Sequence, residues 1–230
     1  LVATGSSSRT LDVPGKGLAG IFPLRKMADA EAIKRDLRAC RGPVVIVGGG
    51  LVGVKSLEAL ASKKKQIHLA ISSDRILSQM LDRPASDFFL RAFERHGVRV
   101  HFHADVTAFH GGERVEGVSL SDGTTLACDL AIIGKGVNPN VGCLKDTGVA
   151  LNQGVRVDAH MATNVPAIFA AGDVAEPMDV LQQRSVPSTI WPSATEGGRI
   201  AGLNMAGVPA TFSGALRMNS VEILGVRVIS

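Results

Sequence analysis

The sequence predicts an α/β fold whose parallel sheet carries an antiparallel meander. A buried strand at Val44–Val47 runs through glycines into a helix, and further strands and helices alternate after it. Short strands separated by glycine turns then follow from 104 to 127. Alternating strands and helices are typical of a parallel sheet, whereas short strands joined by tight turns pair antiparallel.

The N-terminal segment carries few strong signals. Leu1–Gly5 is predicted to be the end of a buried strand that runs into a turn, and we interpret the chain as a piece of a longer one. Residues 15–20 fit G-x-G-x-x-G, but no strand precedes them and no helix follows, so a loop is predicted. Ala28–Ala39 has Ile33 and Leu37 on one face, which predicts an amphipathic helix.

The central unit is a strand, a glycine turn and a helix. The four apolar residues of Val44–Val47 are typical of a strand buried on both faces, and apolar residues recur at helical spacing from Leu51 to Ala61. The glycines between them fit G-x-G-x-x-G, a pattern that indicates a dinucleotide pyrophosphate site when it lies between a strand and a helix. The candidate binding residues of this turn are Gly48, Gly49, Gly50, Leu51, Val52 and Gly53.

Further elements complete this domain. We expect strands at Gln66–Ile71 and Val98–Phe102, with a helix at Ser86–His96 between them. A buried strand at Asp129–Ile133 then returns to the sheet and runs into Gly134-Lys135-Gly136. The strands expected in the meander are Ala104–Phe109, Val115–Leu120 and Thr124–Ala127.

A third region follows the Pro/Asn loop Val137–Asn140, which we take as a domain boundary. Strands are predicted at Val155–Asp158 and Ile168–Ala171, and a helix is predicted from about Ser193 to Ala206. Residues 193–196 read Ser-Ala-Thr-Glu, a capping box that predicts where this helix begins.

Composition argues against several classes of protein. A net charge of +4 and 4% aromatic residues are low for a nucleic-acid platform, and the basic run Lys63–Lys65 is expected to end a surface helix. No apolar run approaches the roughly 18–20 residues of a membrane span, and no signal sequence opens the chain. We therefore expect neither nucleic acid nor a membrane as a partner.

Cysteines and histidines give no sign of a metal centre. Cys40, Cys128 and Cys143 form no metal-ligand spacing, so a reducing cytoplasm is expected, with Cys143 a small buried residue. His101 and His103 would share one face of a strand, but no third ligand falls at a recognisable spacing. No side chain stands out as a catalytic acid, base or nucleophile.

Three separated segments resemble one family. Leu1–Gly5 is similar to its A-T-G strand, 44–53 to its nicotinamide-dinucleotide motif, and Thr163–Asp173 to its second flavin motif. Trp191-Pro192, which leads into the last helix, adds to the likeness. The chain resembles the two-dinucleotide-binding-domain flavoproteins of the pyridine nucleotide–disulfide oxidoreductase superfamily. Within it, rubredoxin reductases, NADH oxidases and nitrite-reductase-like flavoproteins are most similar.

The resemblance implies a Rossmann-like NAD(P)-binding domain, with its antiparallel meander, inserted in a split FAD-binding domain of which only part is present. Residues 1–22 would end the first FAD-domain half, and 23–141 would form the NAD(P)-binding domain. Residues 142–210 would form the second FAD-domain half, and 211–230 would start a C-terminal interface domain. The glycine turn for the FAD pyrophosphate would lie upstream.

The resemblance also implies a flavin site. Asp173 would accept hydrogen bonds from the ribityl hydroxyls, and the helix from Ser193 would direct its positive end toward the flavin ring. The other flavin-side candidates would lie near the phosphates or where the chain crosses between domains. The full set is Thr4, Gly5, Arg9, Gly172 and Asp173.

Two positions depart from the family pattern. Relatives usually carry Glu where this chain has Lys55, and an acidic residue that holds the adenine ribose where it has Ile71. Without that carboxylate, Ser72 and Arg75 are candidates to bind a 2′-phosphate, although Asp74 could neutralise the arginine. We therefore predict NADPH binding at least equal to NADH. The candidates beyond the glycine turn are Ile71, Ser72, Arg75, Gly134 and Gly136.

The implied activity is that of an FAD-dependent NAD(P)H oxidoreductase. Hydride would pass from nicotinamide to flavin, and electrons would then go to an acceptor that the sequence does not name. A protein electron acceptor and a homodimer are the macromolecular partners that fit this reading. The alternative is a non-catalytic nucleotide-binding module, either a fragment or a degenerate parent, which Lys55 and Ile71 favour.

Overall fold

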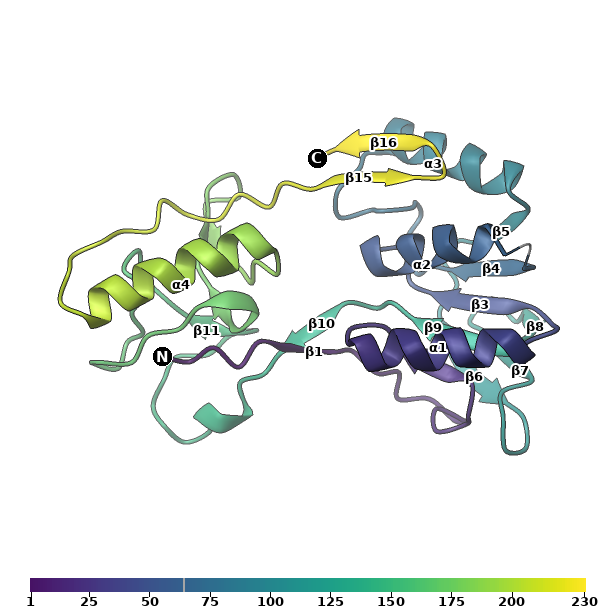
Figure 1. Ribbon diagram of the computed structural model, residues 1–230, viewed down its shortest axis with the longest axis horizontal. Helices are drawn as coiled ribbons and strands as arrows, with labels where there is room; N and C mark the ends of the chain where they lie inside the picture. Colours follow the sequence, from purple (N-terminus) through teal and green to yellow (C-terminus); the bar gives the residue numbers. More distant parts are fainter. Residues whose placement is uncertain (64) are drawn as a thin grey trace. The chain divides into compact units, whose positions relative to one another are not determined.

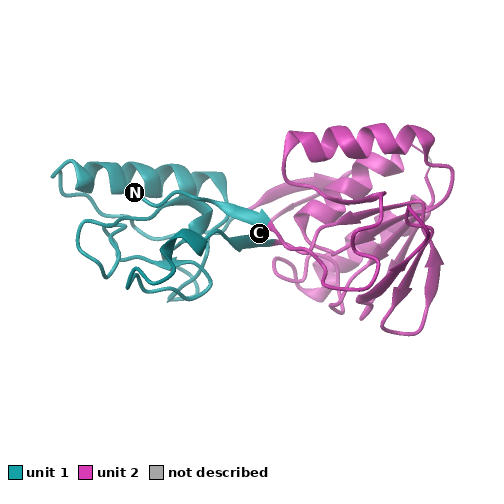
Figure 2. Ribbon diagram, turned by 90° about the horizontal axis from the view of Figure 1, so that it is seen from below, with its two compact units in different colours: residues 1–7, 137–218 teal, residues 8–136, 219–230 magenta. Residues whose placement is uncertain are grey.

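The structure is a computed structural model that describes residues 1–63 and 65–230, and it divides into two compact units (Figures 1 and 2). Unit 1 contains Leu1–Ser7 and Val137–Met218, and unit 2 contains Ser8–Gly136 and Asn219–Ser230. Within the described residues, no helix has the length and apolar character needed to cross a membrane.

A five-stranded parallel sheet forms the centre of unit 2 (Figure 1). The residues of its three middle strands are fully buried, because α-helices cover one face and the meander covers the other. The predicted parallel sheet is confirmed. In spatial order its strands are β2 (Ile21–Pro23), β9 (Leu130–Ile133), β3 (Val44–Val47), β4 (Ile67–Ala70) and β5 (Val98–His101).

Successive side chains of β3 point alternately into two different hydrophobic cores. Val44 and Ile46 pack in the core shared with the helices, whereas Val45 and Val47 pack in the core shared with the meander. Successive side chains of a strand point to opposite faces, so one short apolar run serves both layers. Helices α1 (Met27–Ala39), α2 (Leu51–Ala61) and α3 (Arg83–Arg95) cover the first face, and strands β6 (Val106–His110), β7 (Gly117–Leu120) and β8 (Thr125–Ala127) form the meander.

Helix α3 begins three residues before the predicted start at Ser86. Asp82 caps it, since its Oδ1 accepts a hydrogen bond from Ala85 N at 2.9 Å, and Pro84 lies in the first turn, where its missing amide costs nothing. Helix α2 ends at Ala61; of the basic run expected at its end, Lys64 lies outside the described residues.

A C-terminal hairpin packs on the helices of unit 2. Leu224 N donates to Glu58 Oε1 at 2.9 Å, and Val221 and Ile223 join the helix-side core. Residues 8–22 also belong to this unit, so the compact units and the expected domains divide the chain differently at both ends. The functional assignment of those end segments stays a prediction. The hairpin strands are β15 (Ser220–Ile223) and β16 (Val226–Ile229).

Unit 1 has one long helix, α4 (Trp191–Met205), and short paired segments. Its core gathers residues such as Val155, Met161 and Ile200. The described strand pairs at or within it are β1 (Ser6–Ser8) with β10 (Val137–Pro139), β11 (Val155–Arg156) with β12 (Ala175–Glu176), and β13 (Met178–Asp179) with β14 (Arg184–Ser185). Single 3-10 turns are η1 (Gly142–Leu144) and η2 (Gly172–Val174).

Several sequence predictions for unit 1 are wrong in detail. The expected loop at Val137–Asn140 contains strand β10, because β1 pairs with it. The expected strand at Ile168–Ala171 forms only isolated bridges, in which Ala170 pairs with Val2 and Phe169 pairs with Ala162. The expected buried strand at the N-terminus is likewise reduced to that one bridge. Long-range partners, not local apolar pattern, decide these segments.

The start of α4 and the site of Cys143 also differ from expectation. The helix begins at Trp191, since Pro192 fits the first turn, and the Ser193 hydroxyl bonds to Ser188 Oγ at 2.9 Å instead of capping the helix. The predicted capping box is therefore wrong. Cys143 is exposed in η1, not buried, because only Leu144 of that turn enters the core.

Candidate functional site

The glycine turn after β3 is closed by backbone contacts. Gly48 has φ +113°, a conformation that favours glycine, and its amide donates to Ala70 O at 2.8 Å. A Cβ added to Gly53 would overlap Gly48 O, and one added to Gly49 would lie 2.7 Å from Ile71 Cγ2. The fold itself therefore requires these glycines.

Gly50 is different, since a Cβ added there would meet no atom within 4 Å. It is the N-cap of α2, is exposed, and has an ordinary extended backbone with φ −82°. Neither packing nor backbone strain explains a glycine at this position. A ligand that approaches the backbone would explain it, and the first amides of α2, with Leu51 and exposed Val52, are the donors that would face an anion there.

The loop after β9 closes the other side of this turn. A Cβ on Gly134 would lie 2.9 Å from Gly53 N, so the loop and the start of α2 pack backbone against backbone. Gly136 has φ +86° and accepts a hydrogen bond from Arg9 N at 2.9 Å. The structure thus brings the predicted glycines of both loops to one edge of the sheet.

The end of β4 lies beside the glycine turn. Ile71 is 1% exposed and packs in the helix-side core, whereas Ser72 is exposed. The next loop folds over the turn, since Leu77 N donates to Gly49 O at 2.9 Å. Lys135, which the sequence analysis did not single out, extends its ammonium group to Ser72 Oγ at 3.1 Å.

Arg75 is engaged inside its own loop. Nε donates to Leu81 O at 2.9 Å, Nη1 to Asp74 Oδ1 at 2.9 Å, and Nη2 to Ser78 O at 3.1 Å. These bonds fix the loop between β4 and α3. Any role of Arg75 in binding a phosphate would require some of them to break.

Lys55 has a structural partner that accounts for the departure from the family pattern. Its Nζ bonds to the Glu58 carboxylate and donates to Glu222 O at 2.8 Å, which joins α2 to the C-terminal hairpin. The hydrogen bond from Lys55 lowers the pKa of Glu58, which favours the charged pair. The residue therefore serves this packing contact and is not by itself a sign of a degenerate site.

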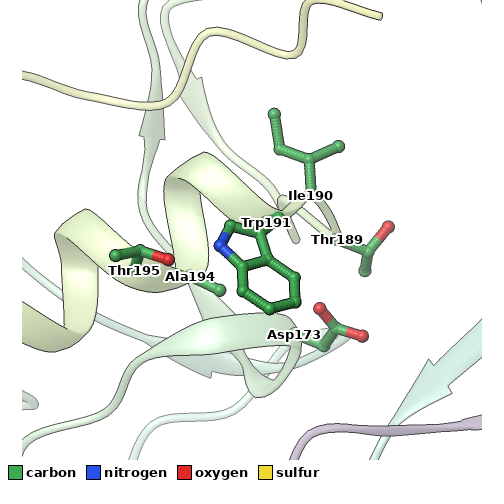
Figure 3. Close-up of a pocket in the computed structure, with 6 residues that line it drawn as sticks. All are labelled: Asp173, Thr189, Ile190, Trp191, Ala194 and Thr195. Carbon is green, nitrogen blue, oxygen red and sulfur yellow. The ribbon is translucent and has the colours of Figure 1, made fainter.

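Asp173 lies in a pocket of unit 1. Gly172 before it has φ +77°, and the buried Ser6 hydroxyl donates to Asp173 Oδ2 at 2.6 Å. The pocket has a volume of about 410 Å³, and the Trp191 ring at its rim belongs to a residue that is 85% exposed (Figure 3). Its lining residues come from η2, from the segment that leads into α4 and from the start of α4: Asp173, Thr189, Ile190, Trp191, Ala194 and Thr195.

Thr4 and Gly5 lie in a segment that is hydrogen-bonded to Asn140. Thr4 Oγ1 donates to Asn140 O at 2.7 Å, Asn140 Nδ2 donates to Thr4 O at 2.9 Å, and Asn140 N donates to Gly5 O at 2.9 Å. Arg9 is exposed in unit 2. Ser6 and Asn140 could not have been selected from the sequence, because only pairing of β1 with β10 brings them to these partners.

His101 pairs with His68 and not with His103. His103 follows β5 with φ +52°, so it does not share a strand face with His101 as predicted. His101 Nε2 instead lies 3.0 Å from Nδ1 of buried His68, and burial is the main cause that lowers the pKa of both rings. Among the described residues, no three His, Cys, Asp or Glu side chains gather in a metal-binding group.

The comparisons with known proteins agree with this geometry. A family model described as pyridine nucleotide-disulphide oxidoreductase matches residues 1–198. The chain is 31% identical over 229 residues to an NAD(P)H sulfur oxidoreductase (CoA-dependent) of Pyrococcus abyssi, covering 98% of this chain and 51% of that protein. It is 36% identical over 177 residues to the ferredoxin–NAD(+) reductase component of the biphenyl dioxygenase system of Paraburkholderia xenovorans, covering 76% and 43%.

A solved structure shows the same fold. A chain in the crystal structure of the covalent putidaredoxin reductase–putidaredoxin complex superposes with a TM-score of 0.90 at 27% identity, covering 99% of this chain and 55% of that one. The chain thus spans about half the length of the curated relatives it matches. With a family model that matches 198 of its 230 residues, the chain belongs to the pyridine nucleotide-disulphide oxidoreductase family.

Proposed function

We propose that the protein containing this chain is an FAD-dependent NAD(P)H oxidoreductase. Unit 2 binds the nicotinamide dinucleotide at the glycine turn, and unit 1 contributes to the flavin site. The observation that carries the proposal is the contrast within the turn. A side chain at Gly53 would clash with backbone, whereas one at Gly50 would occupy only the open space that a ligand phosphate would take.

On the nicotinamide side, this chain's residues bind and orient. The α2 amides at Leu51 and Val52 donate to the pyrophosphate, helped by the positive end of the helix. Gly134 packs the β9 loop against the turn and so fixes the floor of the site. Ser72, exposed after β4, offers a hydroxyl to the adenine ribose.

On the flavin side, the pocket of unit 1 fits a polyhydroxylated chain next to an aromatic ring. The Asp173 carboxylate accepts hydrogen bonds from hydroxyls, and Ser6 holds one of its oxygens in place. Exposed Trp191 offers an apolar surface, and the N-terminus of α4 favours negative charge on a reduced ring. When bound, the flavin would supply the electron transfer chemistry between hydride donor and acceptor.

A protein electron acceptor is the partner we propose. The relative in Paraburkholderia is named as a ferredoxin reductase component, and the solved structure is of a reductase joined to putidaredoxin. We also propose a cytoplasmic location, because all three cysteines are free, and a homodimer built by the C-terminal region as the resemblance implies.

An absorption spectrum of the full-length protein tests the proposed function. We expect a bound flavin whose visible bands bleach when NADH or NADPH is added without oxygen. Asp173→Ala should lower flavin content, while Lys145→Ala, an exposed change in the same unit, should leave it unchanged. A colourless full-length protein that still binds a dinucleotide would support the non-catalytic module instead.

A further inference from the structure

The ammonium group of Lys135 lies where residues after three strands meet. Lys135 follows β9, yet its Nζ donates to Ser72 Oγ at 3.1 Å and to Asp105 Oδ1 at 2.7 Å. Ser72 follows β4, and Asp105 lies in the segment after β5, directly before β6. The Lys135 side chain is 24% exposed and that of Asp105 is 54% exposed, so both charges remain accessible from solvent.

This position corresponds to the ribose end of a dinucleotide site. The carboxyl ends of parallel strands share one edge of a sheet, and the group that reads the adenine ribose usually stands at the end of the strand next to the glycine turn. Here that strand is β4, and Ile71 after it is buried and apolar. Groups that contact a 2′ substituent must therefore come from residues nearby, and Lys135 is brought there by the fold.

Arg75, a second cation near this strand end, is less available. Arg75 already donates to Asp74 and to two backbone carbonyls, as described above. Lys135 has three hydrogens, and within the described residues two of them have partners. A 2′-phosphate can accept the third and compete with Asp105 for the ammonium group.

We propose that Lys135 and Asp105 together read the 2′ position of the adenine ribose, so that the site accepts both NAD(H) and NADP(H). The inference rests on the proposed function of the glycine turn. Lys135 donates to a 2′-phosphate, with the Ser72 hydroxyl as a second donor. Asp105 accepts a hydrogen bond from a 2′-hydroxyl, and so supplies the carboxylate that Ile71 lacks.

The test compares binding of ADP-ribose and 2′-phospho-ADP-ribose to the full chain by titration calorimetry, which needs neither flavin nor turnover. The unchanged chain should bind the two ligands within about tenfold of each other. Lys135→Met should weaken 2′-phospho-ADP-ribose at least tenfold and leave ADP-ribose nearly unchanged. Asp105→Asn should shift the ratio the other way, toward the phosphorylated ligand. Lys34→Met, the same loss of charge at an exposed position of α1, should not alter the ratio.

The outcomes separate this inference from the proposed function. If both ligands bind but neither Lys135→Met nor Asp105→Asn changes the ratio of their affinities, the ion pair only connects the meander to the sheet. The inference is then overturned, while the proposed dinucleotide site is supported. If neither ligand binds, both fail. The partly exposed ion pair contributes little to stability, so both variants should fold. If Lys135→Met nevertheless unfolds, the opposite shift of Asp105→Asn decides alone.

Discussion

The two units satisfy the hydrogen bonds of their buried backbone groups in different ways. In unit 2, five parallel strands pair with one another and form cores on both faces of the sheet. In unit 1, the described strands pair only two by two, and side chains take over much of the pairing. Buried Glu176 accepts from Gly154 N at 2.5 Å, and buried Asp179 accepts from Leu181 N at 3.0 Å and Gln182 N at 2.9 Å.

The two units are therefore sensitive to substitution at different places. An irregular backbone that is held by a few buried carboxylates depends on each of them, because each carboxylate accepts hydrogen bonds from backbone amides that belong to no sheet ladder. A sheet spreads its hydrogen bonds over many residues, so its sensitive points are the places where backbones touch. In unit 2 these are the glycines of the turn after β3.

The largest effect is expected at Asp179 of unit 1. Asp179→Ala removes a carboxylate that also pairs with Arg217 Nε at 2.8 Å, and we expect the free energy of unfolding of this unit to fall by about 3 kcal/mol. Glu222→Ala removes the exposed ion pair with Arg227 and should cost less than about 1 kcal/mol. Denaturant unfolding measures both. Equal costs would show that unit 1 does not depend on its buried carboxylates.

A second test exchanges glycines for alanine in the two units. Gly53→Ala forces a Cβ into Gly48 O and should cost about 2–3 kcal/mol of unit 2 stability. Gly198→Ala, inside α4 with no atom near the added Cβ, should stabilise unit 1 by about 0.5–1 kcal/mol. Thermal unfolding of each variant checks the signs. A stable Gly53→Ala chain would contradict the backbone contact between the turn and α2.

The third test separates folding from binding within the turn. Gly50→Ala should lower the unfolding free energy by no more than about 1 kcal/mol, because its Cβ enters open space at an extended backbone position and the only cost is that alanine caps α2 less well than glycine. It should weaken dinucleotide binding at least tenfold, about 1.4 kcal/mol, since the side chain occupies the phosphate space. Unchanged binding would mean that the ligand does not approach this backbone.

The smallest effect concerns pH. Burial lowers the pKa of His68 and His101 below the ordinary value of 6.5, while the Asp122 carboxylate raises that of His101 in part. The unfolded chain then binds more protons than the folded one, so unit 2 should lose stability as pH falls below about 6.5. His68→Gln should reduce this loss, whereas His160→Gln in unit 1 is the matched control. Stability of unit 2 that rises on acidification would contradict the assigned direction.

The sequence predicted unit 2 far better than unit 1, for a reason visible in particular residues. The four apolar residues of Val44–Val47 by themselves indicate a strand that is buried on both faces, and the predicted strand matches the observed one. Ile168–Ala171 is similarly apolar but forms only single bridges. One joins Ala170 to Val2, which is distant in the sequence, and the other joins Phe169 to Ala162 across a turn. Candidate glycines were found from local spacing, whereas Lys135 and Ser6 gave no local signal.

By itself, the sequence determined four strands of the parallel sheet, its helices, the meander and the glycine turn, because apolar periodicity and the freedom of glycine act over neighbouring residues; it did not predict the edge strand β2. The tertiary structure alone decided which glycines of the turn the fold needs and which one has open space around it. It also decided that Lys55 serves the hairpin, that Arg75 is held in its own loop, and that Lys135 reaches the end of β4. Such contacts form between residues that are distant in the sequence, so the order of residues along the chain does not show which of them the fold brings together.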